Sequence, residues 1–478
     1  MREELVIFWF RQDLRLSDNP GLFEATQHGK VLPIYILDND NSDKYKMGGA
    51  SKLWLHHSLN ALNQSLNLNL SLYCGDPLTI LLKLCLKYNI KRIFWNRCYE
   101  HWRINRDKEI KETLLKRGID VKSYNGSLLW EPWLIKKNDG APYKVFTPFY
   151  YKGCLNAISP RDPLSKPDAL VFYKDNHYSV TINDLKLLSK VGWSKKIAKY
   201  WSFGEAAAQD SLSRFLNHGI NNYKEGRNYP AKSFISKLSP YLHFGEISPN
   251  QVWYAVRQLG DNFNIESFCS ELGWREFSYS QLYYNPHLAN KNLQKKFDDF
   301  PWQHNPEKLI AWQKGQTGIP MVDAGMRELW ETGYMHNRVR MIVGSFLVKN
   351  LLINWQHGER WFWDCLVDAD LASNSASWQW VAGCGADAAP YFRVFNPVTQ
   401  GQKFDPDGEY IRHYVPELKN LPNQYLFSPW EAPQMILNAA GVELGVNYPK
   451  PIVNLSLSRE LAIKAFASLK NTNNHDLE

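Results

Sequence analysis

Residues 4–10 read ELVIFWF, and this apolar run is the first of five that decide the fold of the N-terminal part of the chain. The others are VLPIYIL at 31–37, LSLY at 70–73, RIFWN at 92–96 and VKSY at 121–124. Segments with helical periodicity separate them, at about 19–28, 50–66, 78–88 and 100–118. This alternation predicts an α/β domain with a doubly wound parallel sheet that is covered by helices on both faces.

The segment after the first predicted strand excludes two common nucleotide-binding motifs. It reads RQDLRLSDN at 11–19, without GxGxxG, and the chain contains no GxxxxGK[ST]. Neither a dinucleotide fingerprint nor a P-loop is therefore present. The carboxyl ends of the strands are the default place for a ligand in such a sheet.

The rest of the chain predicts a connector and a helical domain. The α/β domain is expected at 1–130, and a connector rich in Pro, Gly, Lys and Tyr at 131–202. Helical signals dominate at 203–470, including a run from Asp323 to Trp355 that is broken at Thr332-Gly333. We expect an all-α domain there.

Composition predicts a soluble, cytoplasmic protein. Of 478 residues, 44% are hydrophobic and 22% charged, and the mean hydropathy is -0.44. No apolar run approaches the ~18 residues of a membrane span, and the short N-terminal apolar run lacks the features of a signal peptide. The seven cysteines are widely spaced without a CxxC pair, which favours reduced thiols and no structural metal.

The net charge leaves the partner open. The chain has 56 basic and 48 acidic residues, a net charge of +8. This mild excess fits a polyanionic partner or simply a solubilising surface. Aromatic residues reach 14%, with 19 Trp, and core packing accounts for most of them.

Residues 334–355, YMHNRVRMIVGSFLVKNLLINW, place chemically capable side chains around one helical turn. At helical spacing Asn337 and Met341 share a face, whereas Arg338 and Arg340 are expected to project elsewhere. An amphipathic helix end with solvated arginines is the alternative.

Residues 361–380, WFWDCLVDADLASNSASWQW, set two carboxyl groups in an apolar context. Asp368 and Asp370 need a partner there, and Arg340 is a candidate for it. A two-carboxylate metal site is the rival, but further oxygen ligands are missing from the pattern. If the segment is helical, Trp378 and Trp380 point to nearly opposite sides.

Two further stretches carry candidate contacts. The loop FISKLS at 234–239 opens a Pro-bounded helix with hydroxyl groups and backbone N–H groups that suit a phosphate, although ordinary Ser capping explains it as well. Glu271, Trp274 and Arg275 lie within one predicted helical turn. Hydrolytic chemistry is unsupported, because neither HExxH nor GxSxG occurs.

Five ordered motifs together resemble the photolyase/cryptochrome flavoprotein family. They read FWFRQDLRLSDN at 8–19, SKLSPYLHFGEISP at 236–249, WREF at 274–277, GIPMVDAGMRELWETGYMHNRVRM at 318–341, and DADLASNSASWQWVAGCGADAAPYFRVFNPVTQGQKFD at 368–405. The resemblance spans about residues 5–455 and implies an N-terminal α/β domain, a connector and a helical domain that binds FAD.

The resemblance also implies contacts for the flavin. Those expected are Tyr223, Ile235, Ser236, Lys237, Leu238, Ser239, Arg275, Asn337, Arg340, Asp368, Asp370 and Asn374. Ile235 departs from the family pattern, because many relatives carry a hydroxyl residue there. Asn374 is the neutral side chain expected near the flavin N5, and Arg340 with Asp368 is expected to form a buried ion pair.

Within the family, HNRVRM resembles the class I cyclobutane pyrimidine dimer (CPD) photolyases, because (6-4) enzymes place histidines in this helix. The implied catalytic residues are Glu271, Asn337, Met341 and Asn374, and the implied substrate and DNA contacts are Arg227, Trp274, Asn337, Arg338, Trp380, Arg393 and Gln400. Trp302, Trp355 and Trp378 match the family's electron-transfer relay.

The implied activity is light-dependent repair of dimers in DNA by an electron from reduced FAD, with no net redox change. A cryptochrome-type blue-light receptor and a (6-4) photolyase are the alternatives. An antenna chromophore is left open between a folate, a deazaflavin and none, because HLANK at 287–291 lacks the side chains associated with folate antennas. A monomer that needs no protein partner is expected.

Overall fold

Two compact units make up the chain, and they interleave in sequence. The computed structural model describes residues 4–38, 45–168, 170–189, 192–391 and 393–472. By number, the first unit comprises 1–221, 236–286 and 367–370, and the second comprises 222–235, 287–366 and 371–478. The domain boundaries expected from the sequence stay a prediction.

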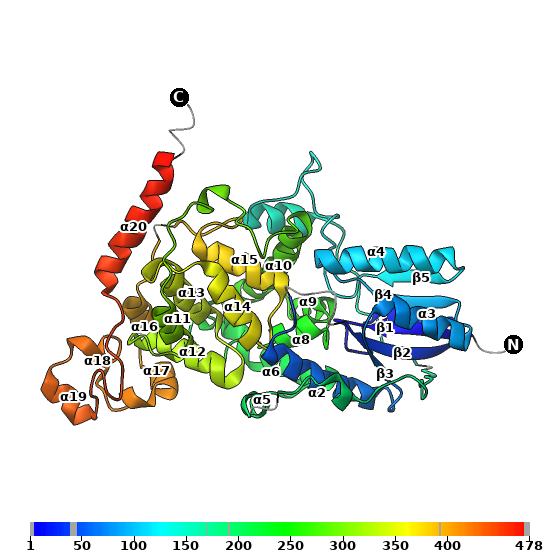
Figure 1. Cartoon of the computed structure of the whole chain (residues 1–478), viewed down its shortest axis with the longest axis horizontal. Coiled ribbons are helices and arrows are strands. Elements are labelled where there is room, and N and C mark those ends of the chain that lie inside the picture. The colour runs from blue at the N-terminus through cyan, green and yellow to red at the C-terminus, as the bar shows by residue number, and fades with distance from the viewer. Residues whose placement is uncertain (1–3, 39–44, 169, 190–191, 392, 473–478) are drawn as a thin grey trace. The chain divides into compact units, whose positions relative to one another are not determined.

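A parallel sheet of five strands, in the order β3-β2-β1-β4-β5, lies in the first unit (Figure 1). The strands are β1 (Leu5–Phe10), β2 (Lys30–Leu37), β3 (Ser71–Cys74), β4 (Arg92–Asn96) and β5 (Asp120–Tyr124). In the register of the sheet, Ile7 of β1 lies opposite Leu32 of β2 and Ile93 of β4. All five predicted strands and their parallel arrangement are confirmed.

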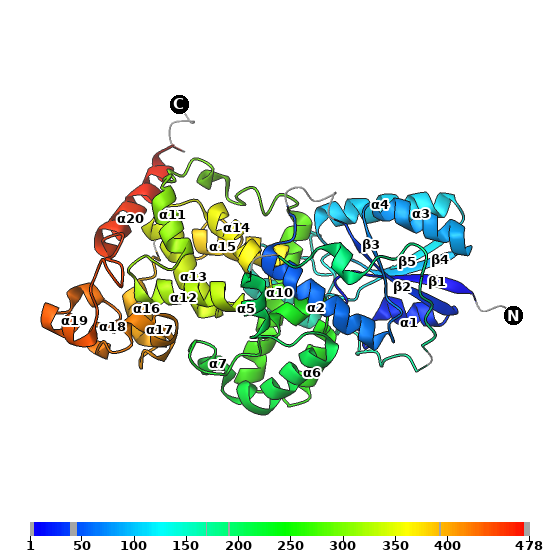
Figure 2. The ribbon, with the colours of Figure 1, turned by 60° about the horizontal axis from the view of Figure 1, so that its bottom comes forward.

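Helices cover both faces of this sheet (Figure 2). They are α1 (Pro20–Thr26), α2 (Gly49–Ser65), α3 (Pro77–Tyr88) and α4 (His101–Lys116). Trp9 of β1 belongs to one buried cluster with Leu81 of α3 and Ile110 of α4. On the opposite face α1 approaches so closely that a Cβ at Gly21 would lie 2.8 Å from Phe8 Cε2. Because neighbouring residues of β1 are buried on opposite faces, the strand is apolar throughout, as expected for a doubly wound sheet.

Local signals set the starts of these helices. Asn19 accepts a hydrogen bond from the Leu22 N–H and is followed by Pro20 at the first helical position of α1. Asp76 accepts from the Thr79 N–H at the start of α3, which again begins with a proline. Such caps satisfy backbone donors that a helix leaves free at its N-terminus.

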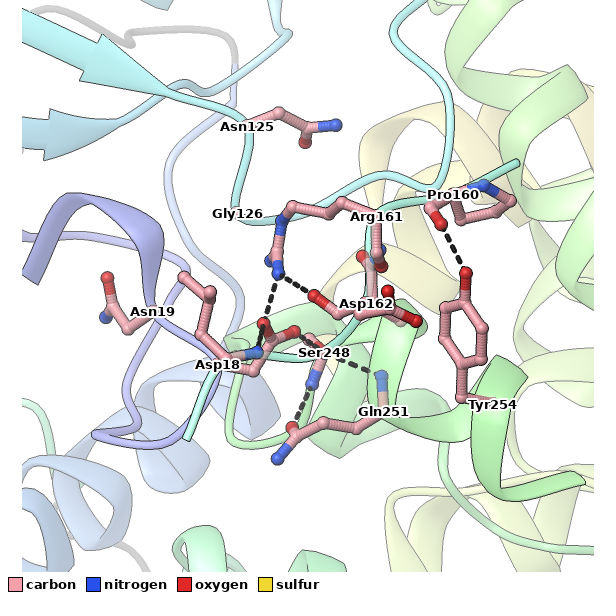
Figure 3. A network of polar contacts seen from close by, with 12 residues as sticks. Asp18, Asn19, Asn125, Gly126, Pro160, Arg161, Asp162, Ser248, Gln251 and Tyr254 are labelled. Carbon is pink, nitrogen blue, oxygen red and sulfur yellow. Dashed lines mark hydrogen bonds and ion pairs between the residues drawn. The ribbon is translucent and has the colours of Figure 1, made fainter. Parts of the chain in front are cut away.

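A buried polar network fastens the predicted connector to the first unit (Figure 3). The fully buried Asp18 carboxylate accepts hydrogen bonds from Arg161, from the Leu164 N–H at 2.9 Å and from the Ser248 hydroxyl. Ser248 also caps α9 (Pro249–Arg257) by a reciprocal capping box with Gln251. One carboxylate therefore ties the β1–α1 loop, the connector and a helix start together.

The remaining helices form the rest of the two units. The first unit contains α5 (Trp193–Ala198), α6 (Glu205–Arg214), α8 (Ser239–Phe244), α9 and α10 (Phe263–Tyr284). The second contains α7 (Tyr223–Gly226), α11 (Pro306–Gln313), α12 (Pro320–Thr332), α13 (Asn337–Ser345), α14 (Trp355–Cys365), α15 (Leu371–Ala382), α16 (Pro397–Phe404), α17 (Glu409–Tyr414), α18 (Asn423–Leu426), α19 (Gln434–Ala440) and α20 (Leu455–Thr472).

The predicted break at Thr332-Gly333 is confirmed. Helix α12 ends there because Gly333 adopts a left-handed conformation, with φ 70°. A glycine tolerates this conformation without the steric cost of a side chain.

The described ranges contain neither a membrane-spanning helix nor a metal-binding cluster of side chains. None of their helices combines the length and the apolar character needed to span a bilayer. In the same ranges no three His, Cys, Asp or Glu side chains are grouped so that they could hold a metal ion. All seven cysteines are free thiols.

Candidate functional site

The loop before α8 has the local structure expected of a turn that opens a helix. Lys237 is exposed and adopts a left-handed conformation with φ 51°. The Ser236 hydroxyl accepts from the Leu238 N–H at 3.3 Å, and the carbonyl of Ser236 accepts from Ser211. Leu238 is buried and anchors the loop. Lys237 and Ser239 beside it are exposed, and Ser236 is partly buried.

Asp368 and Asp370 both receive hydroxyl donors within the first unit. The Ser239 hydroxyl donates to Asp368 Oδ2 at 2.6 Å, and the Tyr279 hydroxyl donates to Asp370 Oδ2 at 2.6 Å. His243 Nδ1 lies 3.6 Å from Asp370 Oδ2. These contacts meet the need for partners that the apolar context creates, while the Arg340–Asp368 pair stays a prediction.

Asp370 is held as a carboxylate despite its burial. Burial by itself would raise the pKa of Asp370, but His243, the charge of Arg275 and the hydrogen bond from Tyr279 outweigh it. The pKa of Asp370 therefore lies well below its ordinary value. A buried anion of this kind can accept a hydrogen bond from a ring N–H group.

Helix α10 carries the predicted residues Glu271, Trp274 and Arg275 within about one helical turn, so that they share one side of the helix. Trp274 is half-buried and stacks on Phe146, with ring centroids 3.8 Å apart. Arg275 donates to the Ser127 carbonyl at 2.8 Å and lies 4.9 Å from the Tyr279 ring centroid. Phe146 and Ser127, which lie outside α10, thus hold the Trp274 ring and the Arg275 guanidinium in place.

Sequence reasoning missed the buried carboxyl group next to Arg275. Glu276 Oε2 accepts from the Trp130 N–H at 3.0 Å, and Oε1 lies 3.3 Å from Arg275 Nη1. Burial raises the pKa of Glu276 to about 7. The sequence signal was the WREF motif itself, in which this carboxylate directly follows the arginine.

In the second unit, α13 begins with the predicted pocket residues. His336 caps the helix by accepting the Arg338 N–H, and Asn337 is exposed at the first position. The Arg338 guanidinium reaches Met341 Sδ at 3.8 Å. The expectation that Arg338 projects away from Met341 is therefore wrong, because residues three apart are also neighbours on a helix. The Arg340 side chain donates a hydrogen bond to the Met335 carbonyl at 2.7 Å.

A basic cluster forms around Phe404, at the end of α16. Arg338 lies over the Phe404 ring at 4.4 Å from its centroid and donates to Asn228. Burial and the charge of the nearby Arg227 lower the pKa of Arg338. Gln400 lies one helical turn before Phe404, on the same side of α16. The structure thus brings together three predicted DNA contacts, Arg227, Arg338 and Gln400. A further one, Arg393, lies on the loop between α15 and α16.

Tyr223, at the start of α7, belongs to the same part of the second unit. Its ring lies 5.4 Å from the Arg227 guanidinium, and the side chain is buried. Ile235 is partly buried in this unit as well. The expected flavin contacts are therefore distributed over both units along the sequence.

Asn374 of α15 is oriented by a buried carboxyl group of α14. Its amide Nδ2 donates to the Glu359 carbonyl at 3.1 Å and to Glu359 Oε1 at 3.2 Å, and Ser375 donates to the same oxygen. Burial raises the pKa of Glu359 to about 7. With Nδ2 held in this way, the orientation of the Asn374 amide is fixed. Sequence spacing gave no signal for Glu359.

Of the three tryptophans predicted to form the electron-transfer relay, two are buried and one is partly exposed. Trp378 is buried and packs so tightly on Gly358 that a Cβ there would lie 2.1 Å from Trp378 Cη2. Trp355, also buried, begins the helix turn that contains Gly358. Trp302 is partly exposed, and the residue after it donates to the Leu352 carbonyl at 2.8 Å. Trp380 of α15 is partly exposed while Trp378 is buried, as the helical spacing predicts.

Ion pairs fill the carboxyl end of the sheet. Arg11 pairs with Asp107, and Arg106 lies 2.7 Å from Asp107 and 2.9 Å from Asp38. The chain's own charged side chains thus meet at the default ligand position of a doubly wound sheet. The antenna chromophore stays a prediction with its alternatives open.

The donor set fits a flavin nucleotide. In the first unit, the buried Asp370 carboxylate suits a ring N–H of an isoalloxazine, and the Ser236–Ser239 loop offers hydroxyl and cationic groups to phosphates. In the second unit, the fixed Asn374 amide suits a polar atom of such a ring. These residues are the kinds of groups that hold FAD.

Comparisons with known proteins agree with this fit. A family model described as the FAD binding domain of DNA photolyase matches residues 268–468, and one described as DNA photolyase matches residues 6–168. The deoxyribodipyrimidine photo-lyase of Agrobacterium fabrum is 46% identical over 475 residues, 98% of each chain. Cryptochrome-2 of Arabidopsis thaliana is 37% identical, over 97% of this chain and 79% of its own length.

A solved structure supports the same relationship. A bacterial class III photolyase from Agrobacterium tumefaciens superposes with a TM-score of 0.94 at 45% identity, covering 98% of both chains. The relatives therefore include a class III photolyase and plant cryptochromes. The class I assignment expected from HNRVRM stays a prediction. In fold, in cofactor-binding domain and in sequence over nearly its whole length, this chain belongs to the photolyase/cryptochrome family of FAD-binding proteins.

Proposed function

We propose that this protein repairs cyclobutane pyrimidine dimers in DNA in a light-dependent reaction. The observation that carries the proposal is the basic cluster around Phe404 of α16, which brings Arg338 close to Arg227. Arg338 belongs to α13, the helix that also carries Asn337 and Met341. Cations bind the DNA backbone, and the adjacent neutral, polarisable side chains receive an extruded lesion. The photo-lyase relative at 46% identity supports this activity.

FAD in its reduced state supplies the light-absorbing electron donor. Asp368, Asp370 and Asn374 orient the ring by accepting or donating hydrogen bonds, and Asp370 remains ionised because Tyr279 and His243 stabilise its charge. Tyr223 and loop residues 235–239 would hold the phosphates. Arg275, Asn337 and Arg340 would join Asp368, Asp370 and Asn374 around the isoalloxazine and ribityl parts.

The lesion contacts that we propose are the side chains implied by the family motifs. Trp274 and Trp380 offer flat aromatic faces to the fused bases, while Asn337 and Met341 contact their edges. Glu271 supplies a hydrogen bond to the base that carries negative charge during ring opening. Trp302, Trp355 and Trp378 would carry electrons from the surface to FAD that has become oxidised, and would so return it to the active reduced state; the repair cycle itself consumes no electron.

Repair under light is the direct test. Chemically reduced protein is mixed with a thymine-dimer oligonucleotide, and the ultraviolet absorbance of the restored thymines is followed under blue light and in darkness. We expect recovery only under light, and no recovery with a (6-4) photoproduct oligonucleotide. Recovery in darkness, or none with the dimer under light, would contradict the proposal.

A blue-light receptor is the second candidate, because Cryptochrome-2 and Cryptochrome-1 of Arabidopsis thaliana are 37% and 35% identical over 97% of this chain. It predicts light-dependent reduction of the flavin without recovery of thymine absorbance. The same assay therefore separates the two functions.

A further inference from the structure

A buried lysine, Lys349, lies in the π-helical turn Phe346–Asn350 that continues α13. Its ammonium group donates to the main-chain carbonyl of Arg393 at 3.0 Å and lies 5.4 Å from the ring centroid of Tyr391. Burial and the charge of Arg393 lower the pKa of Lys349 to about 8. Burying the Lys349 ammonium group costs desolvation free energy, which its hydrogen bond to the Arg393 carbonyl partly offsets.

Lys349 lies on the same side of its helix as the DNA contacts assigned above. Arg338, Met341, Ser345 and Lys349 follow one another at spacings of three and four residues, which align side chains along one helical stripe. The stripe is partly exposed at its Arg338 end and fully buried at Ser345 and Lys349. One helix thus reaches from the basic cluster into the second unit's interior.

Two residues of the stripe hold the loop that carries Arg393. Lys349 binds the Arg393 carbonyl, and Ser345 Oγ accepts from the Phe395 N–H at 3.4 Å. The two contacts bracket a short stretch of main chain, while the Arg393 side chain is exposed. A hydrogen bond from an ammonium group is stronger than one from a neutral donor, so Lys349 is the firmer of the two holds.

We propose that Lys349 is a positioning residue for DNA binding: with Ser345 it fixes the main chain at Arg393, so that the Arg393 guanidinium is presented to the same DNA backbone as Arg338. The proposal rests on the DNA-repair function proposed above. Its physical basis is preorganisation, because a loop that is ordered before binding loses less conformational entropy when the complex forms.

The test measures the salt dependence of DNA binding by the FAD-loaded protein. The variants are Lys349→Met, which keeps the side-chain length, and Arg393→Ala, singly and together, with a dimer-containing single strand as the probe. Asn350→Leu is the matched control, because Asn350 is buried in the same turn but donates to Ser458 of α20 and not to the loop. Ser345→Ala loosens the second hold if Lys349→Met fails to fold.

Losing one phosphate contact should weaken binding by roughly 5- to 10-fold near ~0.1 M salt and reduce the slope of log Kd against log salt by about 0.7–0.9. We expect Lys349→Met and Arg393→Ala each to cause this change, the double variant to add nothing further, and Asn350→Leu to retain the original slope. Flavin absorbance of every variant should match the original protein.

Two results overturn the inference, and they differ from failure of the repair proposal. A Lys349→Met protein with the original slope, beside an Arg393→Ala protein with a reduced slope, refutes the positioning role. If Arg393→Ala leaves DNA binding unchanged, Arg393 does not contact the DNA, and Lys349 has no DNA contact to position. In either case light-dependent repair still stands or falls by its own assay.

Discussion

Replacing Glu359 by Gln should remove a defined part of the pH dependence of stability. Glu359 is buried, accepts from Asn374 and Ser375 through Oε1, and has a pKa raised from 4.5 to about 7. Gln retains that acceptor oxygen. At low pH both side chains are neutral and of nearly equal shape, so the two proteins should then be about equally stable.

The sign and size follow from proton linkage. Between the unfolded and folded pKa values the native Glu359 keeps a proton that the unfolded chain has lost, so stability falls as pH rises, by about 1.4 kcal/mol per unit. From about pH 5.5 to the folded pKa near 7 this loss amounts to about 2 kcal/mol, and it levels off above that pH. Between about pH 5.5 and about pH 8.5 the stability advantage of Glu359→Gln over the original protein should therefore grow by about 2 kcal/mol, and it should reach about 3 kcal/mol relative to low pH, where the two are about equal.

Urea unfolding at the two pH values measures this difference. Far-ultraviolet circular dichroism and flavin fluorescence are recorded together, and coincident transitions justify comparing free energies. Glu359→Leu serves as a companion variant: it also abolishes the titration, but it removes the Oε1 acceptor of the Ser375 hydroxyl and of one of the two Asn374 hydrogen bonds, at a cost of about 1–3 kcal/mol. If the original protein and Glu359→Gln lose stability in parallel between the two pH values, the raised pKa of Glu359 is refuted.

Three further outcomes are expected. Trp378→Phe should slow photoreduction of FAD while dimer repair by chemically reduced protein continues, and Trp253→Phe, which alters a buried indole of the first unit, should photoreduce normally; equal rates in both would contradict the relay. Gly358→Ala should lower the melting temperature by the equivalent of about 1–3 kcal/mol, because its Cβ would overlap the Trp378 ring. Asp18→Ala should cost about 3–5 kcal/mol in thermal unfolding, because a buried carboxylate with three donors is lost; a loss below ~1 kcal/mol would mean that the connector is held by other contacts.

The sequence alone was sufficient for the architecture. Each strand of the sheet is a short apolar run between turn signals, and two of the four helices between the strands, α1 and α3, start at a residue whose side chain caps them, Asn19 and Asp76. The helix break at Gly333 is equally local, since a left-handed residue ends the helix. Family motifs then indicated FAD binding, which the family models confirm.

Long-range partners could not be predicted. The spacing around Asn337 indicated a helix with two arginines, but it could not tell that Arg338 reaches back to Met341 and over Phe404. Asp368 and Asp370 were expected to need partners, yet the sequence offered no reason to choose Ser239 or Tyr279.

The sequence by itself determined where helices and strands begin and end, because caps, turns and periodicity act between residues that are close along the chain. Only the tertiary structure decided which ionisable groups are paired with an opposite charge and which have a pKa shifted from its ordinary value. Glutamate is usually found at the surface, but Glu276 and Glu359 are buried, and their pKa values near 7 arise from burial by residues that folding brings around them. Burial is a property of the packed chain, and no short stretch of residues encodes it.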